Sequence, residues 1–167
     1  MAQTFTKIVV DGFQDGEFDF AAALQRNASK LADVDNLITA LVAAEGSTTT
    51  DTFFAVTIVG HADRDDVPGL SAEERRAQEL DASKQRAVSA LNFVLNQLGF
   101  TPPATVDNLK TIGIDGAFAG EGDLVNLVPA NEADRQQNRR VVFLVIQFSA
   151  QSQPLSFGEP DPDRGVA

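Results

Sequence analysis

Two side chains with opposite charge stand out as candidates for binding chemistry, Asp63 and Arg86. Asp63 ends the short sequence Gly60 to Asp63, which directly follows an apolar run. Arg86 lies on one helical face with Glu79 and Ser83, because these residues are spaced by four and by three. Arg86 can therefore face Asp63 without entering the core. The two charges either share a binding site, or Asp63 caps a turn while Arg86 pairs at the surface with a glutamate such as Glu79, which contributes about 0 to 1 kcal/mol.

The other reactive residue types form no recognisable cluster. His61 is the single histidine, so it cannot belong to a histidine metal site or to a serine protease triad, and we expect it to pack and to form hydrogen bonds where a strand meets a loop. Asp63, Asp65 and Asp66 resemble part of a calcium loop, but valine and proline follow where a ligand and the essential glycine belong. The chain has no cysteine. We expect no metal and no cofactor.

A strand and a helix must position these two charges. Residues Phe53 to Val59 are aromatic and β-branched, which predicts a strand that ends at Gly60. Ser71 and Glu74 form a capping box, which predicts a helix start, and Gly99 predicts its end. Its apolar stripe consists of Leu80, Ala87, Leu91, Val94 and Leu98. The strand thus leads to Asp63, and the helix leads back to Arg86.

The N-terminal part predicts one more strand and one more helix. Residues Phe5 to Val10 form the strand, and Asp11 to Asp19 form a turn-rich stretch. From Phe20, apolar residues recur at helical spacing, which predicts one helix of about 25 residues to Glu45. We expect this helix to serve core packing.

The C-terminal part predicts two strands separated by a loop. Lys110 to Ile114 reads as a short strand that Gly116 ends, and Phe118 to Asp134 reads as a long loop with a helical turn near its end. Val141 to Phe148 is nearly all apolar, which indicates a strand that is buried on both faces or central in its sheet. The order is β-α-β-α-β-β. We therefore expect an α/β chain of the two-layer α+β sandwich type, with two long helices on one face of a mixed four-stranded sheet.

Composition limits the number of domains and the kinds of partner. The chain has 167 residues, 43% of them hydrophobic, and a net charge of -11. We expect one domain over residues 1–150 and an irregular acidic tail over 151–167, which contains Pro154, Pro160 and Pro162. The acidic charge argues against a nucleic-acid partner. The sequence shows neither an export signal nor an apolar stretch of membrane-spanning length, so we expect no membrane insertion.

Three motifs resemble those of one family, the OmpA-like peptidoglycan-associating domains of porins, peptidoglycan-associated lipoproteins and flagellar stator proteins. The first, Gly-His-Thr-Asp, is similar to Gly60, His61, Ala62 and Asp63. The second, Asn-x-x-Leu-Ser-x-x-Arg-Ala, has its last four fixed positions held by Ala82, Ser83, Arg86 and Ala87. The third, Arg-x-x-Asn-Arg-Arg-Val, is matched by Arg135, Asn138, Arg139, Arg140 and Val141. The resemblance runs from about Phe5 to Phe148, with Glu79 at the Asn position and a longer separation between Asp63 and Arg86.

This resemblance implies a non-catalytic module that anchors a protein to the cell wall, in the periplasm or cell envelope. Its ligand is the diaminopimelate residue of the peptidoglycan stem peptide. Asp63 is implied to take the ammonium group, Arg86 the carboxylate, and Ser83 to add a hydroxyl. The residues implied to support this site are His61, Glu79, Asn138, Arg139 and Arg140. The arginines before the last strand either brace the binding loop and pack against acidic residues, or simply form a solvated start to the strand.

Two other functions remain open. The chain is alternatively a structural subunit of a larger secreted or phage-like particle, which keeps the fold without wall binding. Leu155 and Phe157 in the tail are spaced by two and can point the same way, so we expect the tail to dock on a protein partner or on a second copy. A hydrolase has little support, because no matched acid and base pair can be identified.

Overall fold

A computed structural model describes residues 2–48, 51–64, 68–100, 109, 111–119 and 124–150. Three expectations lie outside these residues: the calcium-like loop at Asp65 and Asp66, the chain break at Pro102 and Pro103, and the tail over 151–167. The structure therefore does not test them.

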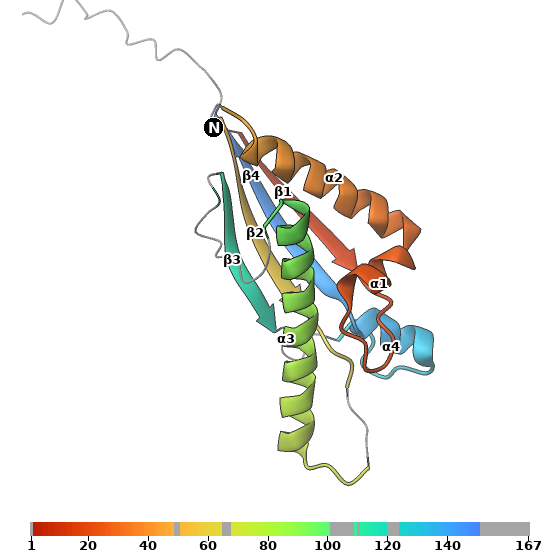
Figure 1. Cartoon of the computed structure of the whole chain (residues 1–167). Helices are drawn as coiled ribbons and strands as arrows, with labels where there is room; N and C mark the ends of the chain where they lie inside the picture. The colour runs from red at the N-terminus through yellow and green to blue at the C-terminus, as the bar shows by residue number, and fades with distance from the viewer. Residues whose placement is uncertain are drawn as a thin grey trace, which may run out of the picture.

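The centre of the fold is a mixed four-stranded sheet (Figure 1). Its strands are β1 (Ala2–Val10), β2 (Thr52–Gly60), β3 (Ile112–Ala119) and β4 (Val141–Ser149), in the order β1-β4-β2-β3. Strand β4 is antiparallel to both β1 and β2, whereas β2 and β3 are parallel. The predicted α+β fold with a mixed four-stranded sheet is confirmed, and so is the central place of the apolar last strand.

Strand β3 is longer than the sequence predicted. Gly116 lies inside it and pairs with Thr57, while Val56 pairs with Ile114. The register therefore shifts by one residue between these two pairs, as it does at a β-bulge. The prediction that Gly116 ends the strand was wrong, because the bulge accommodates the glycine and pairing continues beyond it.

The first predicted helix is divided in two. Helix α1 (Phe20–Gln25) is followed by α2 (Ala28–Glu45), with Asn27 as the N-cap residue of the second. The side-chain amide of Asn27 donates a hydrogen bond of 3.0 Å to Asp11 Oδ1. The prediction of one continuous helix was wrong, because this contact with the end of β1 holds Asn27 outside helical geometry.

The second long helix agrees with its prediction. Helix α3 (Ala72–Gln97) begins with the capping box: Ser71 Oγ accepts from the Glu74 amide at 3.2 Å, and the Glu74 carboxylate accepts from the Ser71 amide at 2.8 Å. These hydrogen bonds lower the pKa of the Glu74 carboxyl, and the one from the Ser71 backbone has the larger effect. A fourth helix, α4 (Glu132–Asn138), takes up the end of the long predicted loop.

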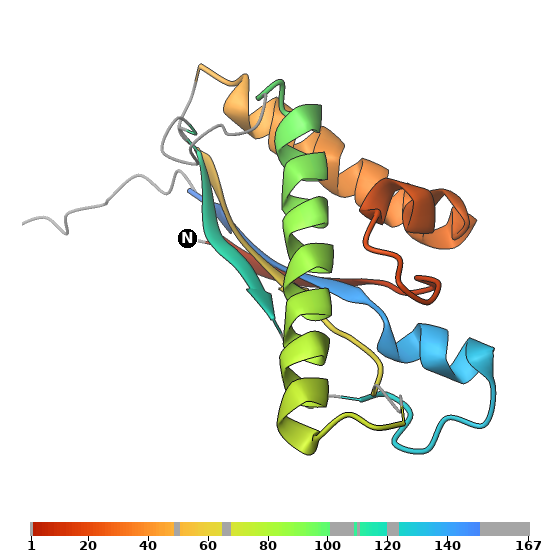
Figure 2. The same ribbon diagram turned by 60° about the horizontal axis from the view of Figure 1, so that its bottom comes forward.

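The core lies between the sheet and the helices. Phe54, Val56 and Ile58 of β2 are buried and pack in one cluster with Leu41 of α2 and Val94 of α3. Figure 2 shows both long helices on the same side of the sheet, so the predicted two-layer arrangement is confirmed. None of the helices in the described ranges combines the length and the apolar character needed to cross a membrane.

Candidate functional site

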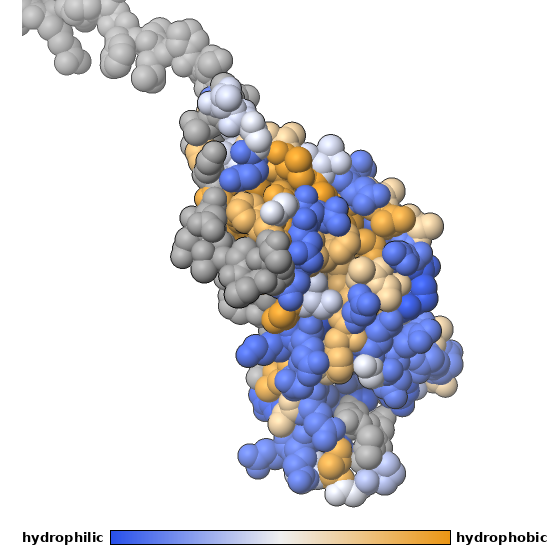
Figure 3. All heavy atoms as spheres, in the orientation of Figure 1, coloured by the Kyte–Doolittle hydropathy of each residue, from blue (hydrophilic) through white to orange (hydrophobic). Residues whose placement is uncertain are grey.

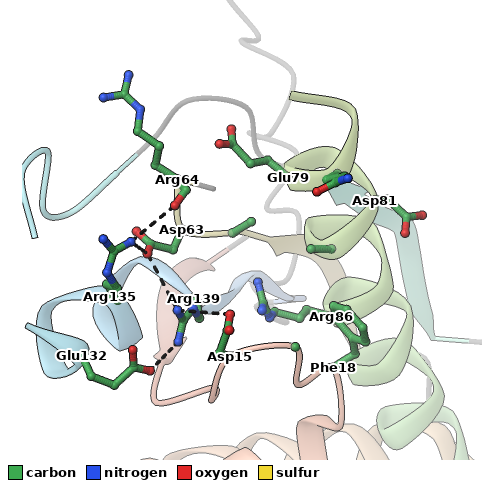
Figure 4. Close-up of a pocket in the computed structure, with 14 residues that line it drawn as sticks. Asp15, Phe18, Asp63, Arg64, Glu79, Asp81, Arg86, Glu132, Arg135 and Arg139 are labelled. Atoms are coloured by element: carbon green, nitrogen blue, oxygen red, sulfur yellow. Dashed lines mark hydrogen bonds and ion pairs between the residues drawn. The ribbon is translucent and has the colours of Figure 1, made fainter. Parts of the chain in front are cut away.

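An open pocket of about 690 Å³ lies beyond the ends of β2 and β4, between α3 and α4. Figure 4 shows that α4 supplies one side of the pocket and α3 the other. The charged residues that line it are Asp15, Asp63, Arg64, Glu79, Asp81, Arg86, Glu132, Arg135 and Arg139. In Figure 3 the same end of the molecule, over the first half of α3 and over α4, is mostly hydrophilic. Guanidinium and carboxylate groups therefore alternate around one cavity.

Close packing of β2 against α3 brings the first two motifs together. A Cβ atom added to Gly60 would lie 1.9 Å from the carbonyl oxygen of Ser83 and 2.9 Å from the amide nitrogen of Ala87. Only a glycine permits this approach of backbone to backbone. The amide of His61 then donates a hydrogen bond of 2.8 Å to the carbonyl of Arg140. The loop that carries Asp63 is thus held between α3 and the start of β4.

Asp63 is held by side chains of α4 rather than by Arg86. Its Oδ2 accepts from Arg135 Nη1 at 2.7 Å, and its Oδ1 accepts from Asn138 Nδ2 at 2.8 Å. Arg139 Nη2 lies 3.9 Å from the same Oδ2. The carboxylate side chain is only 5% exposed, although Asp63 lines the pocket. The third motif therefore positions the acid of the first.

Asn138 connects this carboxylate to a neighbouring loop. It is fully buried, and besides Asp63 its Nδ2 contacts the carbonyl oxygen of Asn126 at 2.9 Å. Its Oδ1 accepts from the Asn126 amide at 2.8 Å. Both polar ends of the Asn138 amide group are thereby satisfied, so the residue fixes Asp63 and the segment before α4 together.

Arg86 is buried, with 3% of its surface exposed, yet it lines the pocket, so the alternative of a pair at the surface was wrong. Its Nε donates to the carbonyl of Glu17 and its Nη1 to the carbonyl of His61, each at 3.0 Å. Its guanidinium also lies over the rings of Phe13 and Phe18, 5.4 and 5.5 Å from their centroids. Two backbone carbonyls and two aromatic faces compensate for the burial of this charge.

Arg86 is surrounded by charges of both signs. Burial, and then the charge of Arg139, lower the pKa of the Arg86 guanidinium to about 10, against the opposing effects of Glu17, Asp15 and Asp63. The guanidinium remains charged at neutral pH. An anion placed beside both arginines would relieve the repulsion between them.

Arg139 packs against acidic residues of the same chain. Its Nη1 lies 2.5 Å from Glu132 Oε1, its Nη2 lies 3.4 Å from Asp15 Oδ1, and its side chain is 7% exposed. Arg140 is also buried, and its Nη1 donates to the carbonyl of Asn138 at 3.3 Å. Arg140 does not belong to the described lining of the pocket.

The remaining site residues that the sequence predicted do not all line the pocket. Ser83 is 1% exposed, and its hydroxyl donates to the carbonyl of Glu79 at 2.7 Å, within the same helix. Glu79 itself lines the pocket, whereas Ser83 does not. His61 is buried at the junction of strand and loop, and its carbonyl accepts from Arg86.

Several lining residues were not singled out from the sequence. Asp15 and Phe18 come from the turn-rich stretch before α1. Arg64 directly follows Asp63, and Glu132 is the first residue of α4. Only Arg135 had a signal, as the first position of the third motif. The turn before α1 reaches the pocket because the Gly12 amide donates to the carbonyl of Gln136 in α4, at 3.2 Å, a contact that local sequence does not encode.

No protein-family model and no curated protein matches this sequence. Among solved structures, a MotB-like protein from Desulfovibrio vulgaris is similar, with 18% identity and a TM-score of 0.45 over 84% of this chain and 72% of that chain. The cell wall anchor of the T6SS from Pseudomonas aeruginosa has 17% identity and a TM-score of 0.42, over 88% and 82%. The periplasmic domain of Helicobacter pylori MotB has 18% identity and a TM-score of 0.33, over 74% and 66%. At these values the likeness concerns the arrangement of the chain and not its function.

Proposed function

We propose that this chain is a non-catalytic module that binds peptidoglycan, and that its pocket takes the diaminopimelate residue of the stem peptide. The observation that carries the proposal is the convergence of Asp63, Arg86 and Arg139, one from each of the three motifs, on a single pocket. A volume of about 690 Å³ lies within the usual range of about 300 to 1,000 Å³ for small-ligand pockets.

The ligand chemistry matches the charges of the pocket. Diaminopimelate offers an ammonium and a carboxylate on one carbon, so it needs an acceptor and a donor at opposite sides of a cavity. The carboxylate is placed at Arg86 and Arg139, whose mutual repulsion it relieves. Within the described residues, Arg86 Nη2 donates no hydrogen bond to the protein, so it is free to bind this carboxylate.

The ammonium group is placed at Asp63 and Asp15. A carboxylate offers about four lone-pair positions, and the short hydrogen bonds from Arg135 and Asn138 occupy two of those on Asp63. Asp15 is 92% exposed and stands at the rim. Ser83 is left out of the proposed contacts, because its hydroxyl is bonded to Glu79.

A binding role also agrees with the residue types at the site. The described lining of the pocket holds carboxylates, arginines, one glutamine and small or apolar residues, with no serine, threonine, histidine, lysine or cysteine. Carboxylates can act as nucleophiles or as general acids and bases, but that of Asp63 already accepts hydrogen bonds from Arg135 and Asn138. We infer that the module holds the wall without cleaving it.

Cosedimentation with purified walls tests the proposal. The full chain should sediment with peptidoglycan of the diaminopimelate type and not with the lysine type, and equal binding to both would refute the ligand assignment. Asp63→Asn should weaken binding about thirty-fold or more, since the loss of one partner of a desolvated charge pair typically costs about 2 to 5 kcal/mol. Lys30→Ala, in α2 with a side chain that is 37% exposed, is the control and should bind as the wild type does.

A second variant separates binding from folding. Asp15→Asn changes a side chain that is 92% exposed, so the melting temperature should stay the same. Its affinity should fall by about five-fold, since an exposed charge pair contributes up to about 1 kcal/mol. In a zymogram the wild type should leave the wall intact. Clearing that disappears in Asp63→Asn would instead establish a hydrolase.

A further inference from the structure

The sheet face opposite the helices carries an apolar surface. Successive side chains of a strand point to opposite faces of the sheet. The residues that point away from the core lie opposite one another on β1, β4 and β2. The apolar residues on this outer face are Phe5, Val9, Phe53, Ala55, Val59, Val142, Leu144, Ile146 and Phe148. When one face of an antiparallel sheet is exposed to water, apolar and polar residues normally alternate along its strands. These strands carry apolar residues on the outer face as well, which indicates that something covers it.

The exposure is greatest where β4 ends. Phe5 is 63% exposed and pairs with Ile146, while Phe53 is 44% exposed and pairs with Phe148. Two residues beyond this last pair, the amide of Ala150 donates to the carbonyl of Asp51 at 2.8 Å. The chain therefore leaves the sheet beside its most exposed apolar side chains.

The size of the outer face argues against a second copy as its cover. On β1, β4 and β2, each strand has four outward positions. With strands about 4.8 Å apart and about 3.4 Å per residue, this described part of the outer face has a flat area of roughly 400 Å². A stable dimer usually buries about 800 Å² on each partner. A partner copy would also bring a second net charge of -11. One extended segment suits this area better.

The remaining part of the chain has the right length and composition. Residues Gln151 to Ala167 follow directly, and Leu155 and Phe157 are spaced by two, so they lie on one side of an extended segment. The four residues before Leu155 span about 13 Å, enough to turn around the end of the sheet. Lys7 is the one charged residue at the outward positions of β1, β2 and β4, and Glu159 can meet it.

We propose that the C-terminal segment, Gln151 to Ala167, folds back over the outer face of the sheet and seats Leu155 and Phe157 against Phe5 and Phe53. The segment covers the outer face within one molecule and keeps two sheets from packing together. This role is independent of wall binding, because the outer face and the pocket belong to different sides and ends of the sheet.

Cysteine pairing tests the proposal, because the chain has no cysteine of its own. Ser156→Cys combined with Ala55→Cys, on the outer face, should give an intramolecular disulfide in dilute full-length protein. The matched control combines Ser156→Cys with Val42→Cys, which is 45% exposed on α2. We expect the first pair to form at least ten times faster than the control. Equal rates would overturn the proposal, and disulfides between molecules alone would show that a second copy covers the outer face and would favour assembly.

A second measurement does not depend on new cysteines. Replacing Leu155→Ser and Phe157→Ser together should raise the fluorescence of a dye that binds exposed apolar surface by several-fold, whereas Val166→Ser should not. The domain should stay folded, because a core cluster of sheet and helix residues, such as Val56 with Leu41 and Val94, remains intact. An unchanged signal with an unchanged far-ultraviolet spectrum would refute the cover.

Discussion

The guanidinium of Arg86 donates a hydrogen bond of 3.0 Å to the carbonyl oxygen of His61, two residues before Asp63. The same guanidinium donates to the carbonyl of Glu17, in the turn before α1. Arg86 therefore joins the two loops that form opposite sides of the pocket. A residue proposed to bind the ligand is also part of the scaffold, so its removal affects both stability and binding.

Replacing Arg86→Ala should lower the free energy of unfolding by about 2 to 4 kcal/mol, since it leaves two backbone carbonyls without their charged donor and creates a cavity. Urea denaturation measures this change. Lys30→Ala removes the same charge from a partly exposed position and should stay within about 0.5 kcal/mol of the wild type. An Arg86→Ala protein as stable as the wild type would contradict the bracing role.

The pH dependence of stability should also report on Arg86. Burial, followed by the charge of Arg139, lowers its pKa from the usual arginine range to about 10. Above about pH 10 the folded protein therefore releases the Arg86 proton more readily than the unfolded chain does. Unfolding then binds a proton, so the contribution of Arg86 to stability rises with pH in this window.

The measurement compares the wild type with Arg86→Met by urea denaturation from about pH 9 to about pH 11.5. The wild type should gain stability relative to the variant as the pH rises through about 10, in the direction that the lowered pKa requires. The titration of lysines is common to both proteins and cancels in the difference. A difference that stays flat or falls would contradict the burial of a charged Arg86.

Local signals predicted the elements well. The capping box of Ser71 and Glu74 lies within four residues, so the start of α3 can be read from the sequence. The apolar run of β4 likewise predicted its central place, because a nearly all-apolar strand is typical of a strand that is buried on both faces or central in its sheet. The division between α1 and α2 could not be predicted, since it depends on a hydrogen bond from Asn27 to Asp11, sixteen residues away.

Long-range contacts determined what the sequence missed in the site. The partners of Asp63 on α4, Arg135 and Asn138, lie 72 and 75 residues further along the chain. The spacing of residues on α3 placed Arg86 on a polar face, but its burial depends on the carbonyl of Glu17, 69 residues away. Helical periodicity describes one element at a time and does not reveal which loops pack over it.

Asn138→Ala should loosen the segment before α4. The replacement removes hydrogen bonds to Asp63 and to both backbone groups of Asn126 in a fully buried position. We expect a loss of about 2 to 4 kcal/mol, because an unsatisfied buried polar group costs about 1 to 3 kcal/mol. Hydrogen exchange should show at least a ten-fold loss of protection at the Asn126 amide.

The control for this variant is Gln137→Ala. The side chain of Gln137 accepts a hydrogen bond from the side-chain amide of Asn126 at an exposed position and not from its backbone. Its removal should therefore leave the protection of the Asn126 amide within about two-fold of the wild type. If both variants exchange alike, Asn138 does not fix the segment, and the link between Asp63 and the neighbouring loop is weaker than its geometry indicates.

Gly60→Ala should be one of the most damaging small substitutions in the chain. The added Cβ would lie 1.9 Å from the carbonyl oxygen of Ser83 and 2.9 Å from the amide nitrogen of Ala87, and neither backbone atom can move without shifting α3. We expect a loss of about 3 kcal/mol or more, at or above the upper end for overpacked sites. Gly113→Ala is the matched control, since its nearest atom is the Phe54 carbonyl oxygen at 3.8 Å, an ordinary contact. Thermal unfolding of both variants provides the test. Equal melting temperatures would mean that α3 does not need a glycine at the end of β2. The close approach that sets Arg86 beside the loop of Asp63 would then lose its physical basis.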